Sequence, residues 1–162
     1  MVMKKVYVMF SLIFLLQSCE EEKKSYEQDL ENFPSMDFEA SLKDFEKSEK
    51  ATLIYFTGFG CVNCMKFNEV IKAEIGLENI KTKYDFISLY VDGRKKLPES
   101  EWFKSPWYGN VKTNGGVNSV ILFEKLQSGD IPALAIMNKE GEIIKQKSGF
   151  KYNIKEFLEI ED

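Results

Sequence analysis

Two kinds of hydrophobic pattern alternate along the chain, and each predicts a different secondary structure. From Asp37 onward, Phe38, Leu42 and Phe45 recur at near-helical spacing with charged residues between them, which is typical of an amphipathic helix. The stretch Ala51–Thr57 is instead short, continuous and apolar, and it is rich in branched and aromatic residues. Such a run predicts a strand that is buried on both faces of a sheet.

The alternation continues through the middle of the chain. Residues 58–60 (Gly-Phe-Gly) interrupt the apolar run, and apolar residues then return at helical spacing up to Gly76, so a second helix is predicted from Cys61. A second buried strand is predicted over Asp85–Asp92. The segment Gly93–Gly116 has no regular pattern, and we expect an irregular insertion there.

Three large aromatic residues stand out in this insertion: Trp102, Trp107 and Tyr108. If they are buried, they cover the hydrophobic core, which is the interpretation that we favour. If they are exposed, they make the insertion a lid or a binding surface. The sequence leaves both interpretations open.

The last part of the chain predicts a helix, a hairpin and a final helix. The predicted elements are the helix Asn118–Gln127, the strands Ala133–Met137 and Glu142–Ser148, and a last helix capped by Asn153. Strands that are separated by helices need crossover connections and parallel pairing, whereas the closing hairpin pairs antiparallel. We therefore predict an α/β fold with a central mixed sheet flanked by helices on both faces and an insertion after the second strand.

The first residues have the pattern of an export signal. Lys4 and Lys5 precede the apolar run Val6–Leu16, which at about 11 residues is too short to span a bilayer as a helix. The residues around Cys19 resemble the recognition site of bacterial lipoproteins, in which this cysteine is acylated and becomes the mature amino terminus. We predict a signal peptide over residues 1–18, lipidation of Cys19, a polar tether over 19–36 and a single domain over 37–162. An ordinary secretory signal with an incidental cysteine is the alternative.

These features place the protein in a bacterial cell envelope, attached to a membrane through its N-terminal lipid. The acidic run Glu20–Glu22 behind Cys19 resembles a surface-export signal of some double-membraned bacteria, but it also fits a solvated spacer. The domain is therefore expected either to face the periplasm or to lie on the outer-membrane surface.

The composition argues against several classes of function. The net charge is −4 and no basic stripe is present, so nucleic acid is not an expected partner. The chain has no histidine and only three cysteines, which argues against a four-ligand zinc site and removes any Cys-His nucleophile pair. We expect no metal. Haem attachment needs a histidine directly after the second cysteine of a Cys-x-x-Cys pair, where Met65 stands.

The remaining chemistry lies in Cys61 and Cys64. A purely structural disulfide between them closes a very short loop and stabilises little, so a redox pair is the better explanation, with no cofactor beyond the Cys61–Cys64 disulfide itself. At the start of a helix, unpaired N–H groups and the helix dipole favour an anion. Cys61 is therefore the predicted nucleophile, and Cys64, one turn further and partly shielded, is the predicted resolving cysteine.

The segment around these cysteines resembles one particular branch of the thioredoxin superfamily. Phe56–Lys66 (FTGFGCVNCMK) closely resembles the active-site segment of the periplasmic carboxy-terminal domain of DsbD-type transmembrane reductases. Ile87–Asp92, followed by residues 96–98 (Lys-Leu-Pro), is similar to the next segment of the same group. The resemblance covers Ala51–Phe150 and implies a thioredoxin-like fold that acts on protein thiols and disulfides. The membrane module of that family is not in this sequence, so a separate membrane electron donor of DsbD type is an expected partner.

The resemblance also implies a substrate-binding surface. In that family the proline before the penultimate strand is cis and faces the cysteines, and Pro132 is the matching position. We expect Ile131 and Pro132, with a cis bond between them, to offer backbone groups to a substrate strand. Gly60, next to the nucleophile, is assigned to the same surface. A merely structural proline at a strand entry is the alternative for Pro132.

Two positions depart from the family pattern. Tyr55 stands where thioredoxins carry a buried aspartate, and Asn68 stands where the DsbD-like domain has a glutamate, although Glu69 is adjacent. The loss of both carboxylates changes the pKa values and exchange rates of the dithiol, but the cysteines themselves still make and break the bonds.

The leading hypothesis is a thiol:disulfide oxidoreductase that reduces or rearranges disulfides of envelope proteins. Two others stay open. One is a non-catalytic binding lipoprotein that kept the fold, with a structural disulfide, and the missing carboxylates favour it. The other is a two-thiolate copper(I) carrier, since soft thiolates suit that ion.

Overall fold

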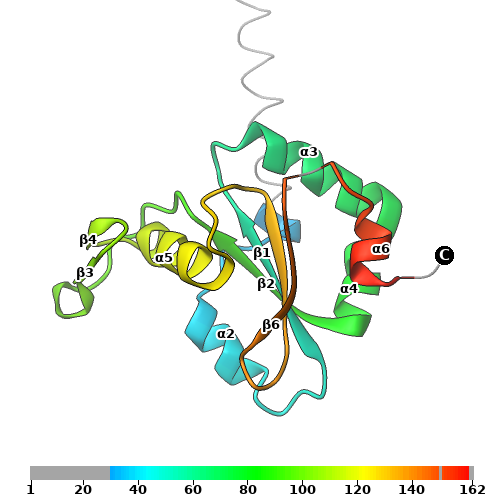
Figure 1. Cartoon of the computed structure of the whole chain (residues 1–162), viewed down its shortest axis with the longest axis horizontal. Helices are drawn as coiled ribbons and strands as arrows, with labels where there is room; N and C mark the ends of the chain where they lie inside the picture. Colours follow the sequence, from blue (N-terminus) through cyan, green and yellow to red (C-terminus); the bar gives the residue numbers. More distant parts are fainter. Residues whose placement is uncertain (1–29, 150, 161–162) are drawn as a thin grey trace, which may run out of the picture. The chain divides into compact units, whose positions relative to one another are not determined.

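A computed structural model describes residues 30–149 and 151–160 of the chain (Figure 1). The chain divides into two units, Met1–Pro34 and Ser35–Asp162. Of the first unit, residues 30–34 are described, and 30–32 are helical. The predicted signal peptide, Cys19 and most of the predicted tether lie outside the described residues. Within the described ranges, no helix has both the length and the apolar character needed to cross a membrane.

The second unit is built on a four-stranded mixed sheet. Its strands are β1 (Ala51–Thr57), β2 (Tyr84–Tyr90), β5 (Ala133–Met137) and β6 (Ile143–Ser148), in the spatial order β2-β1-β5-β6. β1 pairs parallel with β2, and β5 pairs antiparallel with both β1 and β6. The mixed sheet predicted from the sequence is confirmed, and β1 and β5 have the predicted bounds.

The direction of β5 differs from the parallel pairing that the sequence predicted. A helix separates β5 from the preceding strands, which predicted parallel pairing, yet β5 runs antiparallel to its neighbour β1. The segment between the helix and β5, residues 127–132, brings the chain to the carboxyl end of β1, where Ala133 pairs with Phe56. The strand must then run in the opposite direction.

Helices cover both faces of the sheet, as predicted. In Figure 1, α2 and α5 lie on one side, and α3, α4 and α6 lie on the other. Their bounds are Phe38–Asp44 for α2, Val62–Val70 for α3, Leu77–Lys83 for α4, Asn114–Leu126 for α5 and Ile154–Leu158 for α6. The two caps that begin α2 and α6 are made by Asp37, which accepts a hydrogen bond from Ala40 N (2.8 Å), and by Asn153.

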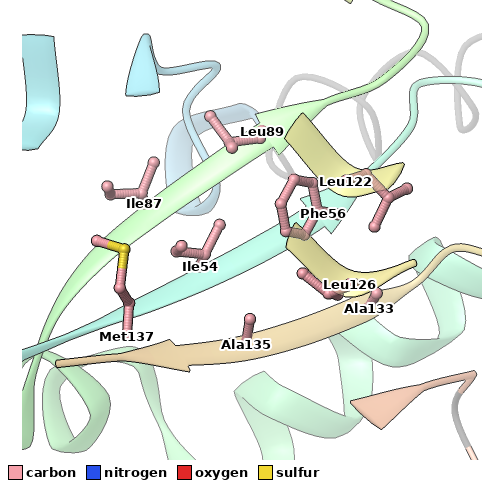
Figure 2. Close-up of a cluster of buried hydrophobic side chains, with 9 residues drawn as sticks. All are labelled: Ile54, Phe56, Ile87, Leu89, Leu122, Leu126, Ala133, Ala135 and Met137. Carbon is pink, nitrogen blue, oxygen red and sulfur yellow. The ribbon is translucent and has the colours of Figure 1, made fainter. Parts of the chain in front are cut away.

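One core lies between the sheet and α5 (Figure 2). Its members from the strands are alternate residues that point to the same face, because successive side chains of a strand point to opposite sides. They are Ile54 and Phe56 of β1, Ile87 and Leu89 of β2, and Ala133, Ala135 and Met137 of β5, and α5 adds Leu122 and Leu126.

The structure refines two helix predictions. The helix predicted from Cys61 up to Gly76 is confirmed in its extent, although its last turn (η1, Ile71–Ile75) is π-helical, and the unpredicted α4 follows Gly76. Gly76 has a φ of 77°, a conformation that suits glycine and ends the helical run. The helix predicted from Asn118 begins four residues earlier, where the Thr113 side chain caps α5 by accepting from Gly116 N.

The insertion after β2 is more regular than predicted. It contains a short 3₁₀ turn (η2, Glu99–Glu101) and a hairpin of β3 (Phe103–Ser105) and β4 (Gly109–Val111). Trp102, Trp107 and Tyr108 are exposed by 38, 59 and 44%. The favoured interpretation, in which these aromatic rings cover the core, is therefore wrong. They form part of the surface instead, with the Trp107 ring resting against Phe123 of α5.

Candidate active site

The two cysteines lie where β1 passes into α3. β1 ends at Thr57, the three residues 58–60 turn the chain, and Cys61 is the N-cap of α3. Cys61 and Cys64 form a disulfide bond. Cys61 is partly exposed, whereas Cys64 is only 1% exposed. The expected asymmetry between a partly exposed first cysteine and a buried second cysteine is therefore present in the structure.

The start of α3 points a backbone donor at the first sulfur. Cys64 N donates to Cys61 Sγ over 3.1 Å, which is a side-chain cap of the helix. The first turn of a helix has N–H groups without intrahelical partners and the positive end of the dipole. A sulfur in this place is stabilised more as a thiolate than as a thiol.

The loop before Cys61 is held by a residue to which sequence reasoning gave no role. The carboxylate of Asp92 accepts from Phe59 N (2.8 Å) and from Gly60 N (2.9 Å), one oxygen for each donor. The Phe59 ring also stacks on Tyr90, the last residue of β2, with ring centroids 4.1 Å apart. A usable signal was present, because parallel strands bring their carboxyl ends to the same edge, and Asp92 follows β2 as residues 58–60 follow β1.

The predicted substrate-binding residues lie beside this loop. The Ile131–Pro132 peptide bond is cis, as the resemblance implied. A Cβ added to Gly58 would lie 3.0 Å from Ile131 Cδ1, so the Ile131 side chain touches the loop that leads to Cys61. The carbonyl of Pro132 accepts from Gly149 N (2.8 Å). Within the described residues, no hydrogen bond engages the backbone of Ile131.

The two positions that lack the family carboxylates are in direct contact. The hydroxyl of Tyr55, on β1, donates to Asn68 Oδ1 on α3 over 2.7 Å. The same hydroxyl lies 3.4 Å from the carbonyl oxygen of Cys64. Both side chains are buried. A neutral hydrogen-bonded pair therefore joins β1 to the helix of the dithiol, at the two positions where the resemblance implied acidic groups.

A second tyrosine lies on the same side of the sheet with a different environment. The Tyr152 ring packs against Phe67 of α3, with ring centroids 5.9 Å apart. Its hydroxyl is buried and has no hydrogen-bond partner within the described residues. This burial raises the pKa of the Tyr152 phenol well above its ordinary value.

Removing the hydroxyl group should change the free energy of unfolding differently at these two tyrosines. Tyr55→Phe removes the donor to Asn68 Oδ1 in a buried site, so the free energy of unfolding should fall by about 1–2 kcal/mol. Tyr152→Phe removes a hydroxyl that has no partner within the described part of the chain, so the free energy of unfolding should stay unchanged or rise. Urea unfolding of the oxidised protein, followed by circular dichroism, measures both. Equal losses in the two variants would contradict the assignment.

Comparison with known protein families gives a match that is consistent with the fold and the position of the two cysteines. A family model described as a thioredoxin-like domain matches residues 38–161. The chain belongs to this thioredoxin-like family. No curated protein matches the chain significantly.

Two solved structures are similar to the chain at low sequence identity, and the first of them shows the same fold. One titled DsbH oxidoreductase is 14% identical, with a TM-score of 0.54, and the alignment covers 80% of this chain and 86% of that one. A disulphide isomerase from Xylella fastidiosa Temecula1 is 15% identical, with a TM-score of 0.44, over 70% of this chain and 78% of that one. The family match and the Cys61–Cys64 pair at the start of α3 together identify a thiol:disulfide oxidoreductase.

Proposed function

We propose that this thioredoxin-like oxidoreductase reduces or rearranges disulfide bonds of proteins in a bacterial envelope. The observation that carries the proposal is the pairing of a partly exposed Cys61 at a helix start with a shielded Cys64. Residues 56–66 also resemble the carboxy-terminal domain of DsbD-type reductases, which supports electron flow from the dithiol to the substrate.

The cycle begins with the reduced pair. The Cys61 thiolate attacks one sulfur of a substrate disulfide, so that bond breaks, a mixed disulfide forms and the leaving thiolate takes a proton. The Cys64 sulfur, after losing its proton, then attacks Cys61 Sγ and displaces the second substrate thiolate. Two electrons have passed to the substrate, and the pair is left as the disulfide present in the structure. A membrane electron donor of DsbD type, itself a dithiol, restores the reduced pair by the same two exchanges.

The surroundings of Cys61 suit an extended polypeptide. The backbone of Ile131, which makes no hydrogen bond within the described residues, supplies a donor and an acceptor for a substrate strand. Pro132 follows Ile131 in the cis form, and Gly60 adds no side chain to the residue that directly precedes Cys61. Val62, directly after the nucleophile, is exposed and offers an apolar contact.

The proposed attachment of the protein to a membrane of the envelope is part of the same proposal, and it is inferred from the sequence alone. A lipid on Cys19 and a polar tether over residues 19–36 would hold the domain at a membrane while leaving it free to meet its substrates. The proposed surroundings are the periplasm or the outer-membrane surface.

Reduction of insulin disulfides by the purified protein, with dithiothreitol as the final reductant, tests the proposed activity. The wild type should accelerate the reaction, and Cys61→Ser should reduce it to the uncatalysed rate. Cys19→Ser is the matched control, because it removes a cysteine outside the pair and should keep full activity. A wild-type rate no higher than that of Cys61→Ser would contradict the proposal and favour a non-catalytic binding protein.

A further inference from the structure

The carboxylate of Asp92 is bound to the loop that leads to the nucleophile. Its two oxygens accept from two consecutive backbone N–H groups, those of Phe59 and Gly60, at 2.8 and 2.9 Å. Gly60 directly precedes Cys61. These two donors are the only hydrogen-bond or ion-pair partners of the Asp92 side chain within residues 30–149 and 151–160. Hydrogen bonds to an ionised acceptor are shorter and stronger than neutral ones, so this carboxylate holds the loop firmly.

The backbone on either side of Asp92 is itself held in place. Before it, Val91 N donates to Thr57 O (2.9 Å), which extends the pairing of β1 and β2 beyond the strands. After it, Gly115 N of α5 donates to Gly93 O (3.1 Å). Asp92 therefore has a defined position relative to β1, and the loop takes its position from Asp92.

The main chain of this loop passes close to the carboxylate. A Cβ added to Gly58 would lie 3.2 Å from Asp92 Oδ2, and a Cβ added to Gly60 would lie 3.7 Å from the same atom. The main chain of residues 58–60 thus runs along the carboxylate in van der Waals contact. Only glycine at position 58 allows this approach without displacing either Asp92 or Ile131.

We propose that Asp92 is a positioning residue that sets the reactivity of Cys61 through the backbone of the preceding loop. The inference rests on the proposed function of Cys61 and deepens it. Asp92 acts in two ways. It occupies the N–H groups of Phe59 and Gly60, so these donors are turned away from the sulfur. It also places a negative charge beside the residue that precedes Cys61, which disfavours a second negative charge on the sulfur.

Both effects of Asp92 disfavour the Cys61 thiolate, whereas the start of α3 favours it. Asp92→Asn removes the charge, keeps one acceptor oxygen and replaces the other with an amide group that cannot accept. The Cys61 thiolate should become more favourable, so the pKa of this thiol should fall. Because the reduced pair gains stability, the reduction potential should become less negative.

The experiment compares Asp92→Asn, Asp92→Glu and the matched control Asp85→Asn in the full chain. Asp85 lies near the opposite end of β2, so its substitution removes the same charge far from the loop. Two quantities are measured on each protein. One is the rate of Cys61 alkylation by iodoacetamide as a function of pH, and the other is the equilibrium constant of the pair in dithiothreitol buffers. Neither depends on a protein substrate.

Asp92→Asn should change the equilibrium constant about tenfold in favour of the dithiol, which corresponds to a potential about 30 mV less negative. Its alkylation midpoint should shift to lower pH. Asp92→Glu retains the charge and should stay closer to the wild type, and Asp85→Asn should equal the wild type. A residue that only stabilised the fold would lower the urea midpoint and leave the potential where it was.

Two results would overturn the inference about Asp92. One is a potential and an alkylation profile in Asp92→Asn that match those of Asp85→Asn, and the other is a potential that becomes more negative. If Asp92→Asn does not fold, Asp92→Ser takes its place, because it also removes the charge and should shift the potential and the alkylation profile in the same direction. Failure of the proposed function is separate: it appears as a wild-type protein that does not reduce insulin, whatever the Asp92 variants show.

Discussion

Cys64→Ser should accumulate as a mixed disulfide with its substrate, whereas Cys61→Ser should form none. Cys61 is the more exposed residue of the pair and lies at the helix start, so it should make the first bond to the substrate. Release then needs attack by Cys64, which is held within the same helical turn. Because an intramolecular attack has a very high effective concentration, its loss should slow turnover by a factor of about 100 or more.

Non-reducing electrophoresis and intact-mass measurement of each reduced variant, mixed with insulin, detect the adduct. Both variants are made in the Cys19→Ser background, so that only one cysteine remains in each. An adduct on Cys61→Ser of equal abundance would contradict the assignment of roles, because it would show that the shielded sulfur reacts directly with the substrate.

Gly115→Ala should destabilise the protein strongly, because the added methyl group has no space to occupy. A Cβ at Gly115 would meet the backbone of Gly93, with the Gly93 carbonyl oxygen at 2.5 Å, and Val91 O at 2.9 Å. These are main-chain atoms held by the contact between α5 and the chain after β2, so they cannot rotate away as a side chain can. The free energy of unfolding should fall by about 3 kcal/mol.

The control for this variant is Gly129→Ala. No atom lies within 4 Å of a Cβ added there, and the residue is exposed. The same methyl group should therefore change the free energy of unfolding by no more than about 0.5 kcal/mol. Urea unfolding of the oxidised proteins measures both variants. Similar losses in the two would show that the close approach of α5 to Gly93 is not maintained in solution.

Elements with a strong local signal were predicted well. β1 and β5 are continuous apolar runs next to glycine and proline, and their predicted bounds agree with the structure. The cap at Asn153 was also found, because capping depends on residues only three positions apart.

Elements with a weak local signal were missed. α4 has only seven residues, and β3 and β4 have three each, which is too short for a hydrophobic period to become visible. The first turn of α5 contains Gly115 and Gly116, which have a low intrinsic preference for a helix. Packing against Gly93 and the cap by Thr113 nevertheless make this turn helical.

The sequence by itself determined the class of fold, the dithiol and the order of its two sulfurs along a helix, because these depend on apolar periodicity and on residues within one helical turn. Parallel pairing brings the chain after β2 near residues 58–60, but only the tertiary structure decided that the Asp92 carboxylate binds the loop before Cys61 and that Tyr55 bonds to Asn68. In the first case, more than 30 residues separate the partners along the chain. Such contacts arise when parallel strands bring their ends to one edge and a helix packs on the sheet, and no local pattern encodes which side chains then meet.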